Sequence, residues 1–81
     1  IERANDNDLG LCSYLYTNSM DKAHIGSEKL ESGCVAVNTG VVAIAEAPVG
    51  GIKQTGYGRE GGSGAIKDYL NVKYTHMGLK I

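Results

Sequence analysis

Cysteine, long apolar runs and excess charge of one sign are all scarce in this sequence, and each scarcity excludes a class of protein. The only two cysteines, Cys12 and Cys34, form no CxxC pair, which argues against a disulfide framework or a structural zinc site. No apolar run of about 18 residues is present to span a bilayer, so no membrane partner is expected. The net charge of -1 gives no electrostatic reason to expect nucleic acid. A reducing, cytoplasmic setting is therefore predicted.

The composition is typical of a small folded domain, with 42% hydrophobic and 21% charged residues among 81. A domain of this size hides only about 60% of the surface that its unfolded chain exposes, so one small core is expected. The sequence opens on Ile1 in "IERAND", which is compatible with the last turn of a helix. Such a start inside an element is what a fragment would show.

Two apolar runs separated by a helical pattern predict one βαβ unit. Leu11–Thr17 is rich in apolar and aromatic residues and predicts a buried strand, and Cys34–Thr39 is a short apolar and β-branched run that predicts a second strand. Two strands joined by a helix usually lie parallel. Between them, with Asn18 as the expected N-cap and Gly33 as the expected stop, apolar or small residues recur at steps of three and four. They are Met20, Ala23, Ser27 and Leu30.

The second half of the chain predicts a long irregular loop, a last helix and a terminal strand. Residues Gly40–Tyr57 contain the only proline and end in glycines, which indicates a loop. Helical spacing returns over Arg59–Leu70, although three glycines weaken its first turn. The last stretch, after Leu70, alternates in the manner of a strand. The predicted fold class is thus α/β, with one βαβ unit, a glycine-rich loop, a last helix and a terminal strand.

The run "GYGREGG" contains the G-x-G-x-x-G spacing of a dinucleotide-binding turn, at Gly56, Gly58 and Gly61. That fingerprint also needs a strand immediately before it and an acidic residue about 20 positions after it. The preceding "GGIKQT" is a poor buried strand, and the chain has ended by that distance. The better interpretation is a sharply turning loop, because glycine adopts positive φ and lets backbones approach closely. A free-standing nucleotide or phosphate binder remains a weak alternative.

Longer stretches of the sequence resemble a known family. "VAVNTG", a proline before a glycine pair, "GGIKQTGYGREGG" and "GAIKDYLNVKY" are similar to the C-terminal segment of the aldehyde dehydrogenase superfamily. The resemblance also extends upstream through "ERANDNDLGLCSYLYTNSMDKAH" and is greatest to the succinate-semialdehyde dehydrogenase branch. It implies that residues 1–70 are the C-terminal part of a catalytic domain and residues 71–81 an oligomerisation strand. The glycine run would then shape a loop.

The resemblance implies that the chemistry lies outside this chain. Family members use a cysteine thiolate, a glutamate and NAD or NADP, and no residue here matches the two catalytic groups. Cys12 and Cys34 are expected to be small core hydrophobes, while His24 and His76 are too few and too far apart for a metal site. We therefore expect no catalytic, cofactor-binding or metal-binding residue, and no cofactor, in the isolated chain.

The resemblance does assign a substrate-entrance loop, "VVAIAEAPVGG", with Val42, Ala43 and Val49 nearest the aldehyde. Val49 stands where the family usually has phenylalanine, which implies a wider or reshaped tunnel. Ala43 stands where the succinate-semialdehyde branch has a serine that binds the substrate carboxylate. A lost donor of this kind costs about 1–3 kcal/mol of binding, so a longer or less polar aldehyde becomes possible. Upstream residues are the alternative source of carboxylate recognition.

Two classes of function are consistent with these features. The first is the C-terminal fragment of an NAD(P)-dependent aldehyde dehydrogenase, whose partners are the remainder of its parent enzyme, a small aldehyde and a second subunit reached through Asn71–Leu79. This fragment would be inactive alone. The second is a non-enzymatic α/β module that self-associates by strand addition.

Overall fold

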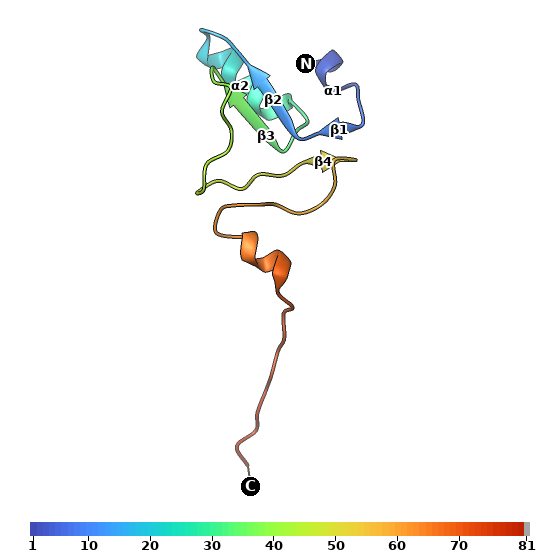
Figure 1. Ribbon diagram of the computed structural model, residues 1–81, viewed down its shortest axis with the longest axis vertical. Coiled ribbons are helices and arrows are strands. Elements are labelled where there is room, and N and C mark those ends of the chain that lie inside the picture. Colours follow the sequence, from blue (N-terminus) through green and yellow to red (C-terminus); the bar gives the residue numbers. More distant parts are fainter. Residues whose placement is uncertain (81) are drawn as a thin grey trace.

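Two short parallel strands and the helix between them form one packing unit of the chain (Figure 1). The computed structural model describes residues 1–80. Strand β2 (Cys12–Leu15) pairs in parallel with β3 (Cys34–Val37), and helix α2 (Met20–Lys29) lies between them in sequence. This is the parallel pairing predicted for the two apolar runs, although each strand is shorter than expected.

Helix α2 begins and ends at residues other than those predicted. Its N-cap is Ser19, whose hydroxyl accepts the Lys22 N–H at 3.3 Å, so the prediction of Asn18 was wrong by one residue. The helix stops because Leu30 adopts an extended conformation, not because of Gly33. The Asn5 side chain caps the C-terminal end of α2, since its Nδ2 donates to the Lys29 carbonyl at 2.8 Å. The side-chain amide of Asn5, and not Gly33, thus satisfies a backbone carbonyl at the C-terminal end of the helix.

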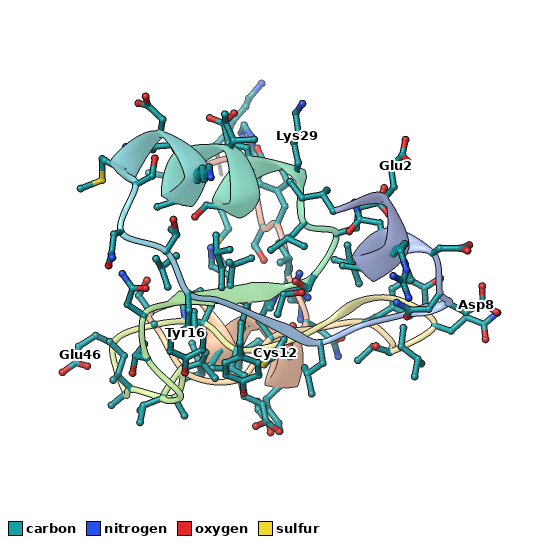
Figure 2. The ribbon with its side chains drawn as sticks, turned by 90° about the horizontal axis from the view of Figure 1, so that it is seen from above. Glu2, Asp8, Cys12, Tyr16, Lys29 and Glu46 are labelled. Atoms are coloured by element: carbon teal, nitrogen blue, oxygen red, sulfur yellow. The ribbon has the colours of Figure 1, made fainter. Side chains whose placement is uncertain are left out.

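The β2–β3 pair is covered on both faces. A methyl group added to Gly26 of α2 would lie 2.4 Å from Leu15 Cδ2, so the helix sits directly on the Leu15 face of the sheet. Figure 2 shows α2 on this side and the segment that carries Glu46 on the other. Ala36 is the one buried hydrophobic side chain among the described residues, at 4% exposure. Tyr14 of β2 is exposed and, apart from Ala36, the other residues of the two strands are half-buried, so the prediction of a buried first strand was wrong.

A second, antiparallel pair joins the start of the chain to the loop after β3. Helix α1 (Glu2–Asn5) leads to β1 (Leu9–Gly10), which pairs with β4 (Ile52–Lys53) in the register Leu9↔Lys53 and Gly10↔Ile52. The stretch Gly40–Tyr57, predicted to be irregular throughout, therefore contains a short strand. This pairing fixes the far end of the loop to the N-terminal segment.

The predicted helix over Arg59–Leu70 is reduced to a five-residue 3-10 helix, η1 (Ala65–Tyr69). Gly61 and Gly62 have φ of 69° and 68°, a left-handed conformation that cannot continue a right-handed helix. The glycines therefore do more than weaken the first turn; they abolish it.

The predicted terminal strand, Asn71–Leu79, does not form in the described part of the chain. Residues 71–80 are extended and exposed, and they pair with no other segment of residues 1–80 (Figure 1). A strand needs a partner for its backbone groups, and this segment runs away from the two sheets. The radius of gyration is consequently 18.4 Å, against about 12 Å for a compact domain of this length. Position 81, the end of the predicted oligomerisation strand, lies outside the described residues.

Candidate functional site

The segment after β3 is a loop whose two limbs are held together by backbone hydrogen bonds. Val49 and Glu60 exchange N–H···O bonds of 2.7 Å in both directions, which makes an isolated antiparallel bridge. Further from the tip of the loop, the Gly62 N–H donates to the Ala45 carbonyl at 3.0 Å. The loop is therefore closed on itself and holds the backbone of Val49 in place.

Arg59 completes the closure of this loop. Its guanidinium donates to the Gly51 carbonyl at 2.9 Å and to the Gly58 carbonyl at 2.8 Å. Its own N–H donates to Asp68 Oδ2 at 3.3 Å. A cation on two carbonyls makes charge-assisted bonds, which are stronger than neutral ones. Arg59 thus links the two limbs of the loop to helix η1.

The closed loop is fastened to the rest of the chain at Gly33 and at Lys53. A methyl group on Gly33 would lie 1.6 Å from the Gly50 carbonyl oxygen, so the two backbones touch with no room for a side chain. Lys53 Nζ forms an ion pair with Glu31 at 2.8 Å and donates to the Asn5 carbonyl at 3.0 Å. These contacts place the loop against the N-terminal ends of β2 and β3.

The three residues predicted to line the substrate entrance are not gathered at one point of the described chain. Val49 is half-buried and lines a hollow of about 730 Å³ together with Leu11, Tyr57 and Arg59. Val42 is also half-buried but lines a different hollow, beside Val35 and Val37 of β3. Ala43 is exposed and lines neither. The three side chains therefore lie in separate surroundings in the described chain.

The described residues contain no assembled catalytic centre. Cys12 and Cys34 are free and half-buried in the β2–β3 pair, and burial raises the pKa of the Cys12 thiol, with a smaller contribution from Cys34. No three His, Cys, Asp or Glu side chains of residues 1–80 come together as metal ligands. Within the same residues, no helix has the length and apolar character of a membrane-spanning segment.

The glycine run has the geometry of a turn. Only the two-residue strand β4 precedes it, and that strand pairs antiparallel with β1. Gly56, Gly58, Gly61 and Gly62 all have positive φ, and the helix after them is the short η1. A dinucleotide fingerprint instead opens a full helix directly from a parallel strand. The positive φ values are those of a turning loop and do not match the dinucleotide fingerprint.

Comparison with known proteins identifies the family of the chain. Residues 1–75 match the aldehyde dehydrogenase family. The chain belongs to this family. The resemblance noted in the sequence is thereby confirmed, and the mixed helix and strand content agrees with part of an α/β aldehyde dehydrogenase fold.

Curated family members and a solved structure give the extent of the similarity. The chain is 47% identical over 78 residues to the succinate semialdehyde dehydrogenase of Acinetobacter baylyi, which covers 96% of the chain. It is 46% identical over 78 residues to the 3-sulfolactaldehyde dehydrogenase of Pseudomonas putida, again over 96% of the chain. The NAD+ complex of an aldehyde dehydrogenase from Bacillus cereus superimposes with a TM-score of 0.89 at 39% identity over 98% of the chain.

The chain corresponds to a small part of these aldehyde dehydrogenases. It spans 16% of the length of both curated relatives and 16% of the Bacillus cereus chain. A segment of an enzyme can be well formed at its loops and yet contain none of the reacting groups. Among the described residues no further strand pairs with the outer edges of the β2–β3 sheet, which is what a segment of a larger sheet would show.

Sequence reasoning missed the residues that fasten the loop. Asn5 bonds both the Lys29 carbonyl and, through its Oδ1, the Glu31 N–H at 2.8 Å. Lys53 contacts the same two residues, through a hydrogen bond to the Asn5 carbonyl and an ion pair with Glu31. The hydrogen bonds among these contacts join side chains to backbone atoms across 24 or more positions, and no local pattern marks them. The pairing of Asn5 with Glu31 could be found only from three-dimensional structure.

Proposed function

We propose that this chain is the C-terminal part of an NAD(P)-dependent aldehyde dehydrogenase that acts on a small aldehyde, most simply a semialdehyde. In this proposal residues 1–70 belong to the catalytic domain and residues 71–81 to the subunit-assembly segment. The supporting facts are the family match and relatives named for succinate semialdehyde and 3-sulfolactaldehyde. NAD or NADP binds to other parts of the enzyme, and a cytoplasmic location is part of the same proposal. The isolated chain is inactive.

The observation on which the proposal depends is the closed loop over residues 45–62. Its two limbs are bridged at Val49 and Glu60, and Arg59 bonds both Gly51 and Gly58. A loop held in this way keeps its side chains at fixed positions, which is what selection of a substrate by shape requires. Val49 faces a hollow from this loop and is the residue best placed to limit the size of the aldehyde.

Two features of the loop determine which aldehyde is preferred. Valine at position 49 leaves more room than an aromatic side chain, so a bulkier aldehyde is accepted. Alanine at position 43 offers no hydroxyl to a substrate carboxylate and is exposed for contact with other parts of the enzyme. Carboxylate recognition then comes from residues outside this chain, or the substrate has no terminal carboxylate.

Substitution at position 43 tests the carboxylate assignment. In the full-length protein, Ala43→Ser supplies the missing hydroxyl and raises kcat/KM for succinate semialdehyde by about 5- to 150-fold, the range equivalent to 1–3 kcal/mol. The matched control is Ala45→Ser, also at an exposed position of the loop. This substitution should leave kcat/KM for succinate semialdehyde unchanged. Equal effects of the two serines would show that position 43 does not contact the substrate.

Substitution at position 49 tests the size assignment. Val49→Phe lowers kcat/KM for long or branched aldehydes relative to short ones, because the larger ring occupies the hollow beside Leu11 and Tyr57. The measurement is kcat/KM over a series of aldehydes of increasing chain length, with Val41→Phe on an exposed part of the same loop as the control. An unchanged size profile in Val49→Phe would contradict a role in the tunnel.

The exposed tail favours one second candidate, a non-enzymatic module that self-associates. Residues 71–80 are extended and include the side chains of Val72, Tyr74 and Leu79, which are 102%, 83% and 92% exposed. An extended apolar segment of this kind can add to the edge of a sheet in a second copy. Gel filtration over a range of protein concentrations, with and without residues 71–81, distinguishes self-association through this tail from a monomeric chain.

A further inference from the structure

The only two cysteines of the sequence are direct neighbours across the parallel β2–β3 ladder. Their Cα atoms are register partners, Cys12↔Cys34, and the Cys34 N–H donates to the Leu11 carbonyl at 3.0 Å. Neighbouring strands lie about 4.7–4.9 Å apart, which falls within the Cα separation of about 4.4–6.8 Å found in disulfides. Both thiols are free in this structure.

The two side chains also lie on the same face of the sheet. Leu15 contacts Gly26 of α2, so the strand alternation puts Cys12 on the opposite face, and its register partner Cys34 projects to that side as well. In Figure 2, α2 lies on one side of the pair and the labelled Cys12 lies toward the other. The nearness of the Cys34 thiol adds to the effect of burial in raising the pKa of Cys12.

Neither a zinc site nor isolated core packing accounts fully for this pair. No third His, Cys, Asp or Glu of residues 1–80 joins them, so a four-ligand zinc site has too few donors here. Both residues are half-buried, unlike Ala36 on the same face, so reagents can reach them. Two accessible thiols at disulfide distance are the defining feature of a closable dithiol.

We propose that Cys12 and Cys34 form a cross-strand dithiol that closes reversibly into a disulfide by exchange with a low-molecular-weight disulfide. One thiolate attacks the small disulfide, forms a mixed disulfide and releases one small thiol. The second cysteine then attacks the protein sulfur of that mixed disulfide, loses its proton and releases the second small thiol. Two protein thiols are thereby oxidised, and one small disulfide is reduced to two thiols.

The geometry makes this bond easy to reduce as well as to form. A relaxed disulfide places its Cβ atoms about 3.5–4.5 Å apart, whereas side chains on neighbouring strands start from a spacing near that of the ladder. Closing the bond pulls two regular strands together, and strained disulfides are the labile ones. The site therefore responds to changes in thiol and disulfide concentration and does not stay permanently oxidised.

The test uses the full-length protein and oxidised glutathione. After incubation, free thiols are blocked and the protein is digested with trypsin, which separates Cys12 in the peptide 4–22 from Cys34 in the peptide 30–53. We expect a linked species two hydrogen atoms lighter than the sum of the two peptides, and we expect reduced glutathione to remove it. Stable glutathione adducts on either cysteine, without the linked species, would overturn the proposal.

The control moves one cysteine by a single residue while keeping two in the segment. In Cys34→Ser combined with Val35→Cys, the new thiol projects to the α2 face, opposite Cys12. The linked species should be lost in this variant, and equal cross-linking would show that the register plays no part. Circular dichroism checks that the variant is folded.

The wild-type protein provides a second measurement that needs no variant. Phenylarsine oxide joins two adjacent thiols, with loss of one water, and so protects both Cys12 and Cys34 from alkylation together. Alkylation of both residues at the unprotected rate would contradict the dithiol. Neither outcome changes the substrate profiles that test the proposed function, so the two proposals can fail separately.

Discussion

Replacing Gly33 by alanine is the sharpest test of how the loop is fastened to the sheet. The added methyl group would lie 1.6 Å from the Gly50 carbonyl oxygen and 2.7 Å from its carbon. Ordinary contact begins at 3.4 Å, so the carbonyl must retreat by about 1.8 Å. The atom met is backbone and cannot rotate away as a side chain would. The limb that contains Gly50 and Gly51 must therefore move as a whole.

The cost follows from the contacts that this movement disturbs. Overpacking of this kind costs about 1–3 kcal/mol. The bond from Arg59 to the Gly51 carbonyl, 2.9 Å long, is lost as well and adds about 1 kcal/mol. The loop is then about 2–4 kcal/mol easier to open, which raises the open population roughly 30- to 900-fold at 1.36 kcal/mol per factor of ten.

Limited trypsin digestion of the full-length protein measures this opening. Lys53 and Arg59 are the trypsin sites in the loop, and both side chains are engaged in the closed form by an ion pair or by carbonyls. Cleavage at a transiently opened site follows the open population when closing is fast. Trypsin should therefore cut Gly33→Ala at these two residues roughly 30 to 900 times faster than the wild type.

The matched control for this experiment is Gly64→Ala, because a methyl group there meets nothing within 4 Å. Its backbone φ is -91°, which alanine adopts freely. The control should be digested at the wild-type rate. Equal digestion of Gly33→Ala and Gly64→Ala would refute the close approach of Gly33 to Gly50.

Two further substitutions test individual contacts by thermal unfolding. Ser19→Ala removes the acceptor of the Lys22 N–H and lowers stability by about 0.5–2 kcal/mol. Asn18→Ala changes stability by less than about 0.5 kcal/mol. A larger loss for Asn18→Ala than for Ser19→Ala would mean that Asn18 is the cap. Asp68→Ala removes one exposed acceptor of the Arg59 N–H at 3.3 Å and costs less than about 1 kcal/mol, so a large loss would mean that this carboxylate organises the loop.

The parts of the fold that could be predicted from sequence are those with a local repeating pattern. Strand β2 was visible as an apolar and aromatic run, β3 as an apolar and β-branched run, and α2 as small and apolar residues at helical steps. Their parallel pairing followed from the helix between them. The family was visible in the motifs of the second half, whose glycines the structure places in a tight loop.

The remaining parts depend on contacts that are distant in sequence or made by other segments. Strands β1 and β4 have two residues each, too few to show any periodicity. The N-cap of α2 is Ser19 and not Asn18, and the sequence could not decide between them because both side chains are favoured at this position. The alternating side chains after Leu70 can form a strand only beside the edge of another strand. Residues 1–80 provide no such edge next to this segment. In our proposal the tunnel lined by Val42, Ala43 and Val49 is likewise completed by the rest of the enzyme.

The most direct measurement of the central claim compares three proteins in one assay, the reduction of NAD+ or NADP+ by an aldehyde followed by absorbance. They are the full-length enzyme, the same enzyme lacking residues 1–81, and the isolated chain. We expect activity for the full-length enzyme, and none for the isolated chain or the truncated enzyme until these two are mixed. Aldehyde oxidation by the isolated chain, or full activity of the truncated enzyme without it, would contradict the account.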